Sequence, residues 1–181
     1  MVRRGSRILG AALLALGCAA PPPPAAPGAT PACQREAAAL ILAAGEQVNA
    51  NAGGPGLPVA VRLYQLRSDA RLRNATFDSI WQDDKAALKG DLLEMSEQTA
   101  YPGQSLRWKL SLSPEASVIA AVALFREPKG KDWFVTFDLE PLRTKPPCPA
   151  TEPEISLWVD RTKIQDGSGH ETRVPGTPPH P

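Results

Sequence analysis

Two segments of the chain alternate apolar and polar residues, and this pattern constrains the fold more than any other feature of the sequence. In residues 106–112 (LRWKLSL) every second residue is leucine or tryptophan. In residues 58–66 (PVAVRLYQL), Val59, Val61 and Leu63 repeat in the same way. A period of two is that of a β-strand with one face toward a core. Both segments are therefore predicted to be half-buried strands.

Three further segments indicate strands. Residues 118–126 (VIAAVALFR) form a continuous apolar run, which is typical of a central strand with neighbours on both sides. Residues 133–139 (WFVTFDL) and 155–159 (ISLWV) follow after turns rich in proline, glycine and charge. Short strands separated by such turns favour an all-β fold in which antiparallel sheets pack as a sandwich.

Two segments have helical features. Residues 74–94 (NATFDSIWQDDKAALKGDLLE) place Phe77, Ile80 and Trp81 on one helical face, and the acidic pair Asp83-Asp84 and Gly90 predict two short helices instead of one. Residues 36–44 (EAAALILAA) are rich in alanine and precede a glycine, so propensity alone favours a helix there.

The N-terminus has the pattern of a secretory signal. Three arginines precede the uncharged residues 8–20, a run that is shorter than the roughly 20 residues of a membrane-spanning helix. The sequence Ala15-Leu-Gly-Cys18 resembles a bacterial lipobox, which implies removal of residues 1–17 and attachment of a diacylglycerol and an acyl chain to Cys18. Because residue 19 is alanine and not aspartate, the resemblance implies an outer-membrane address. Residues 18–32 are then a lipidated N-terminus and a proline-rich stalk that favours extended polyproline II.

Charge and composition exclude several functions. The formal net charge is +1, and removal of three arginines with the signal leaves 17 basic against 19 acidic residues, which does not suit a nucleic-acid binder. Both histidines, His170 and His180, lie near the C-terminus, so the predicted domain has no histidine for a catalytic triad or a metal site. Asp83-Asp84 is interpreted as helix capping and solvation, and Phe77, Trp81, Trp108 and Trp133 as core. We predict no catalytic residue, no metal, no small-molecule substrate and no cofactor apart from the lipid on Cys18.

The remaining cysteines are Cys33 and Cys148. An oxidising periplasm favours a disulfide between them over a metal site, because the chain has no CxxC motif. A bridge would close a loop of more than a hundred residues. Intact mass with and without reductant tests this pairing.

An ordered set of residues resembles the TssJ (SciN/VasD) lipoproteins of bacterial type VI secretion systems. The set comprises Asn49-Ala-Asn51, residues 57–66, Phe77, Ile80-Trp81, Tyr101-Pro-Gly-Gln104, residues 122–126 and Trp133. The resemblance runs from about Leu40 to Val159. It implies a transthyretin-like antiparallel β-sandwich with a small helical insertion, and it replaces the helix at residues 36–44 by a first strand.

The resemblance also implies a function without enzymatic activity. Such a lipoprotein is anchored in the outer membrane, faces the periplasm and binds the periplasmic C-terminal region of the inner-membrane protein TssM, which joins TssL in a membrane complex. The implicated partner-binding loop consists of Asn49, Ala50, Asn51, Ala52, Gly53, Gly54, Pro55 and Gly56. The expected layout is a signal peptide (1–17), a stalk (18–32), a sandwich domain (33–165) and a disordered tail (166–181).

Two other functions remain open at this point. A periplasmic carrier or assembly chaperone could use the same sandwich to hold a small ligand or a client protein. A hydrolase with an unrecognised carboxylate site is the third hypothesis. A ligand retained in native mass spectrometry would favour the carrier.

Overall fold

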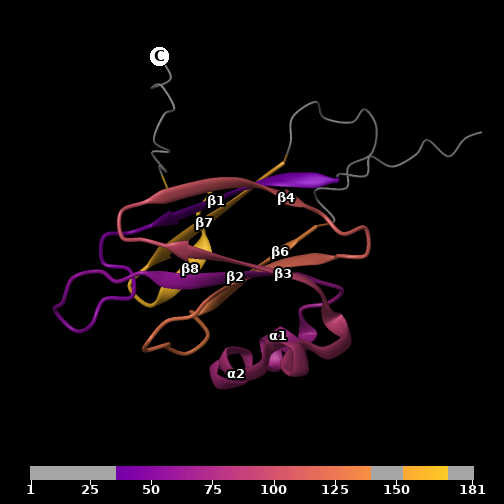
Figure 1. Cartoon of the computed structure of the whole chain (residues 1–181), viewed down its shortest axis with the longest axis horizontal. Helices are drawn as coiled ribbons and strands as arrows, with labels where there is room; N and C mark the ends of the chain where they lie inside the picture. Colours follow the sequence, from indigo (N-terminus) through magenta and orange to yellow (C-terminus); the bar gives the residue numbers. More distant parts are fainter. Residues whose placement is uncertain (1–35, 140–152, 171–181) are drawn as a thin grey trace, which may run out of the picture. The chain divides into compact units, whose positions relative to one another are not determined.

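Strands account for most of the regular structure in residues 36–139 and 153–170, which are the residues that the computed structural model describes (Figure 1). The elements are β1 (Ala37–Ala44), β2 (Val59–Leu66), α1 (Ala70–Asn74), α2 (Phe77–Leu88), a 3-10 turn (Lys89–Asp91), β3 (Leu92–Ala100), β4 (Ser105–Ser111), β5 (Val118–Ala123), β6 (Phe134–Asp138), β7 (Glu154–Asp160) and β8 (Lys163–Asp166). Cys18, Cys33, Cys148 and His180 lie outside the described residues, as do the signal and the stalk. No helix in the described part is long and apolar enough to cross a membrane.

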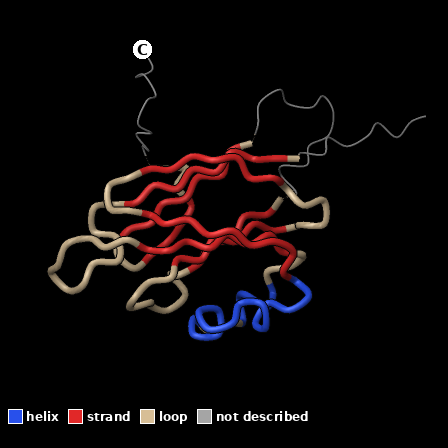
Figure 2. The backbone as a smooth tube through the Cα atoms, viewed as in Figure 1, coloured by secondary structure: helices blue, strands red, loops and turns tan. Residues whose placement is uncertain are grey.

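The strands form two sheets, in the orders β4-β1-β7-β8 and β3-β2-β5-β6 (Figure 2). Apart from β1 and β7, which run parallel, the neighbouring strands of the described part are antiparallel. The all-β sandwich with a helical insertion is confirmed. The parallel pair is the one departure from the expected antiparallel pairing.

The alanine-rich segment forms strand β1, as the resemblance implied. Its backbone pairs with β4 on one side and β7 on the other, so every second residue enters the space between the sheets and the rest lie on the outer face. Ile41, on the outer face, is still only 3% exposed. Arg107 of β4 and Glu154 of β7 flank β1 and join by a 2.6 Å ion pair. Their aliphatic stems therefore shield β1 while the charges stay in water.

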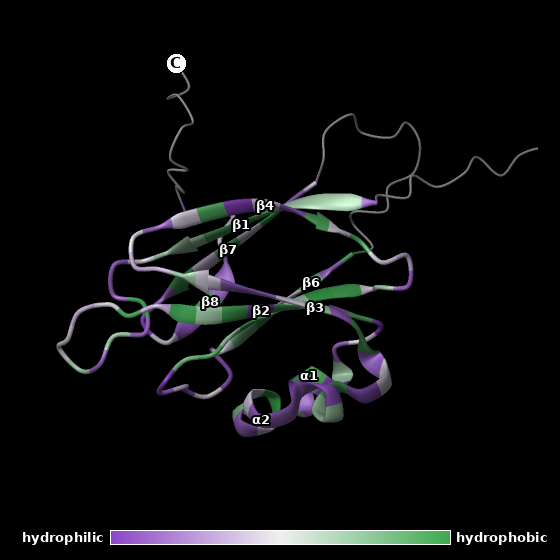
Figure 3. Cartoon of the chain, viewed as in Figure 1, coloured by the Kyte–Doolittle hydropathy of each residue, from purple (hydrophilic) through white to green (hydrophobic). Residues whose placement is uncertain are grey.

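Strand β5 is the centre of the second sheet and is buried along its whole length, which confirms the prediction from its continuous apolar run. Strand β2 lies beside it, and its two faces have different neighbours. Val61 and Leu63 pack in the core, while the tyrosine hydroxyl of Tyr64 reaches Asp84 of α2. The helices therefore form a third layer over this sheet, as Figure 1 shows. Figure 3 shows apolar green along β2 and polar purple over much of α1 and α2.

The helical insertion begins earlier and ends earlier than the predicted segment 74–94. Helix α1 (Ala70–Asn74) was missed, and the last helical turn ends at Asp91. Asp83 has non-helical dihedral angles (φ −154°, ψ 83°), which confirms the predicted break into two helices. Thr76 starts α2, since its side-chain oxygen accepts a 3.2 Å hydrogen bond from the Ser79 amide. The extension of the helices to Glu94 is wrong, because Leu92 and Leu93 already belong to β3.

Two strands, β3 and β8, were missed by the sequence interpretation. The mostly polar β3 pairs with β2 alone among the described strands, so it lies at the edge of its sheet and does not need an apolar face of full length. The four residues of β8 pair with β7 across a turn at residues 161–162, and Ile164 is 2% exposed. Beyond β8, the His170 ring stacks on Trp158 at 4.7 Å between centroids.

Candidate partner-binding end of the sandwich

Four connections meet at one end of the sandwich, which we call the loop end. One is the β3–β4 turn (residues 101–104), and the other three line a common groove. These three are the β1–β2 loop (residues 45–58), the β5–β6 loop (residues 124–133) and the β7–β8 turn (residues 161–162). Strand β7 runs parallel to β1, and β5 runs antiparallel to β2, so all three connections leave the sheets at the same end. The loop end lies at the left of Figure 1.

A groove of about 280 Å³ separates these connections. Its lining residues are Gln47, Ala50, Asn51, Ala52, Gly53, Glu127, Lys129, Arg161 and Thr162. Four of the eight loop residues expected from the sequence thus line it together with residues from two other connections. The loop end therefore presents a composite surface and not a single isolated loop.

Asn49 fixes the base of the β1–β2 loop. Its side-chain Nδ2 donates to the carbonyl of Pro58 at 3.0 Å, and its Oδ1 accepts from the backbone amide of Arg126 at 3.0 Å. Its own backbone amide donates to the carbonyl of Arg161 at 2.6 Å. With 6% of its surface exposed, Asn49 has little area for a partner. Its bonds instead set the three connections relative to one another.

Two residues adopt a left-handed backbone conformation where these connections meet. Asn49 has φ of 52° and Arg161 has φ of 50°. Asparagine tolerates this conformation, whereas arginine rarely adopts it, so the backbone strain lies at Arg161. The backbone amide of Asn49 donates to the carbonyl of Arg161 and joins the two residues directly.

The tip of the loop differs from its base. Leu57 donates to the Val48 carbonyl at 2.8 Å and closes the base, whereas Asn51, Ala52, Gly53 and Pro55 are exposed. A Cβ on Gly56 would lie 2.2 Å from the Glu46 carbonyl oxygen, so this glycine serves close packing at the base. The predicted binding loop therefore divides into an exposed tip, residues 50–55, and a packed base.

Sequence reasoning missed the contribution of Glu127, Lys129, Arg161 and Thr162. The sequence predicts only a turn rich in proline, glycine and charge before residues 133–139, and no turn is predicted before β8. The signal that could have placed these residues at the loop end is the direction of β5 and β7, the strands that precede them. Glu127, Lys129 and Arg161 are exposed, and among the described residues no ion pair involves them.

The acidic pair in α2 has two roles. Asp83 caps the second half of the helix, accepting from the Ala86 amide at 2.9 Å, as the sequence indicated. For Asp84 the interpretation as a solvated group is wrong, because it is 8% exposed and accepts a 2.8 Å hydrogen bond from the Tyr64 hydroxyl. Arg62 bridges Asp84, at 3.3 Å, and Glu97, at 2.9 Å.

This cluster changes the chemistry of Tyr64 without making it a reactive group. Burial raises the pKa of its hydroxyl, and the hydrogen bond and charge of Asp84 raise the pKa further. The hydroxyl thus keeps its proton and remains a donor to Asp84. We interpret the cluster of Arg62, Tyr64 and Asp84 as the polar contacts that hold α2 on the sheet.

The aromatic residues expected in the core have different exposures. Trp133 is 1% exposed and belongs to the core. Phe77 and Trp108 are partly buried and pack against the core. The core prediction is wrong for Trp81, which is 53% exposed.

The described ranges contain no candidate metal site, since no group of three or more histidine, cysteine, aspartate or glutamate residues there could hold a metal ion.

Comparisons with known proteins agree with the geometry. Residues 36–162 match the family model of type VI secretion lipoproteins that is described by the names VasD, EvfM and TssJ. A comparison with curated proteins gave no match.

Three solved structures have a similar fold. Lip from Serratia marcescens, described as a membrane-bound component of the type VI secretion system, is 25% identical, with a TM-score of 0.61 over 72% of this chain and 96% of that chain. A chain in a structure described as a type VI membrane complex is 24% identical, with a TM-score of 0.62 over 74% and 98%. A chain in a structure described as the TssM C-terminal domain (869-1107) from EAEC is 23% identical, with a TM-score of 0.57 over 72% and 96%. With the matched residues spanning β1 to the β7–β8 turn, the chain belongs to the family of type VI secretion lipoproteins.

Proposed function

We propose that this lipoprotein binds the periplasmic C-terminal region of TssM through its loop end and so tethers the secretion apparatus to the outer membrane. The observation that carries the proposal is the composite groove, in which the exposed tip of the β1–β2 loop stands beside Lys129 and Arg161. A chain with this fold also occurs in a structure named for the TssM C-terminal domain. TssL would join indirectly, through TssM.

The arrangement suits a protein interface. Binding surfaces commonly place variable, exposed side chains on a rigid scaffold. Here the scaffold is a base held by the three hydrogen bonds of Asn49, and the tip contributes little to packing. A partner therefore meets loops whose positions are largely set before binding, which lowers the entropy lost on association.

Lipidation at Cys18 supplies the other half of the tether in this proposal. Each buried methylene of an acyl chain contributes roughly 0.8 kcal/mol, and more than one chain is needed for stable anchoring. The proline-rich stalk would let the domain reach away from the outer membrane, on its periplasmic side. Membrane fractionation of Cys18→Ser, compared with the unaltered chain, tests the anchor: release of the variant supports it, and retention in the outer membrane contradicts it.

The proposal assigns no catalytic activity. The family is one of secretion lipoproteins, and the buried carboxylate of Asp84 is already occupied by Tyr64 and Arg62. The start of the predicted tail at residue 166 is wrong, because Asp166 belongs to β8 and His170 stacks on Trp158. A disulfide between Cys33 and Cys148 and disorder after residue 170 remain predictions.

A binding measurement tests the proposal. The chain from Cys18 to Pro181, carrying Cys18→Ser to keep it soluble, is titrated with the cognate TssM C-terminal region. We expect a measurable complex with the unaltered loops and at least about a tenfold rise in Kd for Lys129→Glu combined with Arg161→Glu. Lys85→Glu, an exposed charge reversal on α2, is the matched control. Equal affinity of all three proteins would contradict the assignment, as would the absence of any complex.

A further inference from the structure

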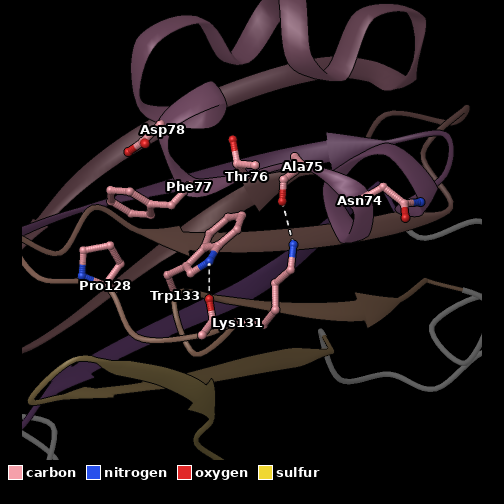
Figure 4. Close-up of a pocket in the computed structure, with 9 residues that line it drawn as sticks. Asn74, Ala75, Thr76, Phe77, Asp78, Pro128, Lys131 and Trp133 are labelled. Carbon is pink, nitrogen blue, oxygen red and sulfur yellow. Dashed lines mark hydrogen bonds between the residues drawn. The ribbon is translucent and has the colours of Figure 1, made fainter.

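A second groove, of about 420 Å³, lies between the helical insertion and the β5–β6 loop (Figure 4). We call it the helix groove. Its lining residues are Asn74, Ala75, Thr76, Phe77, Asp78, Pro128, Gly130, Lys131 and Trp133. One wall is the start of α2, and the other is a loop that also reaches the loop end.

Polar contacts hold the two walls of the helix groove together. Lys131 Nζ donates to the carbonyls of Arg73 at 3.0 Å and Ala75 at 2.5 Å. The same ammonium lies 5.4 Å from the centre of the Trp133 ring, whose Nε1 donates to the Gly130 carbonyl at 3.1 Å. The loop is thus tied to the insertion, and the groove exists before any partner arrives.

Aromatic rings extend the groove from the core to the surface. Phe77 meets Trp133 edge to face at 5.7 Å and stacks on Trp81 at 6.0 Å. Trp133 is buried, Phe77 is half-buried and Trp81 is exposed by 53%. Exposed large apolar side chains are unusual in the described part, where the others are Met95 and Tyr101. An exposed tryptophan beside a preformed groove is a typical anchor of a protein interface.

The helix groove is continuous with the loop end. Glu127 and Lys129 line the loop-end groove, whereas Pro128, Gly130 and Lys131 line the helix groove. Successive residues of one short loop therefore face two grooves, and a single bound protein that covers this loop contacts both. Met95 lines neither groove and lies on β3, at the opposite edge of the sheet from β6.

We propose that the protein bound at the loop end also occupies the helix groove, inserting an apolar or aromatic side chain against Phe77 and Trp81. This inference rests on the proposed function, since it assigns a second contact to the same partner. The occupant is a protein segment and not a lipid surface, because the groove is bounded by backbone carbonyls, Asp78 and Asn74 as well as by rings. Trp81 would be the outer anchor of that contact.

The test compares Trp81→Ala with Met95→Ala, an equally simple truncation of an exposed apolar side chain. Both are made in the chain from Cys18 to Pro181 with Cys18→Ser, and their affinities for the TssM C-terminal region are measured beside the unaltered chain. We expect Trp81→Ala to raise Kd by about tenfold or more, while Met95→Ala leaves it within about twofold. Equal thermal unfolding of the two variants verifies that the difference is not one of folding.

Other outcomes separate this inference from the proposed function. If TssM binds the unaltered chain and Trp81→Ala with the same Kd, the helix groove assignment is overturned and the loop end stands. Loss of binding to vesicles of phosphatidylethanolamine and phosphatidylglycerol in Trp81→Ala alone, with Kd for TssM unchanged, overturns it in favour of a membrane contact. If TssM does not bind the unaltered chain, both proposals fail.

Discussion

The loop end and the helical insertion are both attached to the same two-sheet scaffold, but by different interactions. The loop end is held by neutral hydrogen bonds in which Asn49 donates to the Pro58 carbonyl and accepts from the Arg126 amide, and its charged side chains have no ion-pair partner among the described residues. The insertion is held through the side chains of Arg62, Tyr64 and Asp84, which contact one another. Side chains are therefore used for folding under the insertion, whereas the charged side chains of the loop end are exposed, and the proposed function assigns them to the partner.

The largest expected effect on stability comes from removing the polar contacts that hold α2 on the sheet. Asp84→Ala leaves the buried Tyr64 hydroxyl and the Arg62 guanidinium without their shared acceptor, which should lower the free energy of unfolding by about 3 kcal/mol. Asp83→Ala removes only a capping bond and should cost about 1 kcal/mol. Urea denaturation measures both. A smaller loss of unfolding free energy for Asp84→Ala than for Asp83→Ala would show that the cluster is not the main contact holding α2 on the sheet.

Asn49→Ala should have the next largest effect and should act on both stability and binding. It removes the side-chain partners of the Pro58 carbonyl and the Arg126 amide in two part-buried hydrogen bonds, at a cost of about 2 kcal/mol, and it releases the connections that form the groove. Asn51→Ala, at the exposed tip, should leave the unfolding free energy unchanged within about 0.5 kcal/mol. Unfolding and TssM affinity are measured on both variants. Full affinity in Asn49→Ala would separate the base of the loop from binding.

A smaller effect is expected at high pH. Folding raises the pKa of Tyr64 above the value of about 10 for an unfolded tyrosine, so folding favours the protonated hydroxyl. Its contribution is complete below about pH 10 and is lost as the pH rises toward the folded pKa, at about 1.4 kcal/mol per pH unit. Tyr64→Phe should remove this part of the pH dependence, and Tyr101→Phe, on an exposed tyrosine, should keep it. Identical profiles for the two variants from pH 9 to 11 would contradict this assignment.

Most of the sandwich could be predicted from alternating and continuous apolar segments. A strand with one face on the core needs an apolar residue at every second position, and a strand buried on both faces needs a continuous apolar run. The exceptions have physical reasons. Alanine in β1 favours helix in isolation, and two flanking strands override that preference. The edge strand β3 is mostly polar, and four-residue β8 is too short to show a period.

The candidate site was only partly predictable. Glycine and asparagine mark the β1–β2 loop, but nothing in their types distinguishes buried Asn49 from exposed Asn51. Lys129 and Arg161 join the site through the directions of β5 and β7, which pairing determines and local sequence does not. Trp81 shares helical spacing with Phe77 and Ile80, yet of these three residues the short, broken helix buries only Ile80 completely.

Hydrogen exchange of the chain from Cys18 to Pro181, free and bound to the TssM C-terminal region, tests the central claim most directly. The account predicts slower exchange on binding at residues 50–55, 127–131 and 161–162, with residues 112–117 at the opposite end of the sandwich unchanged. Protection at residues 112–117 with no change in the three loop segments would contradict it.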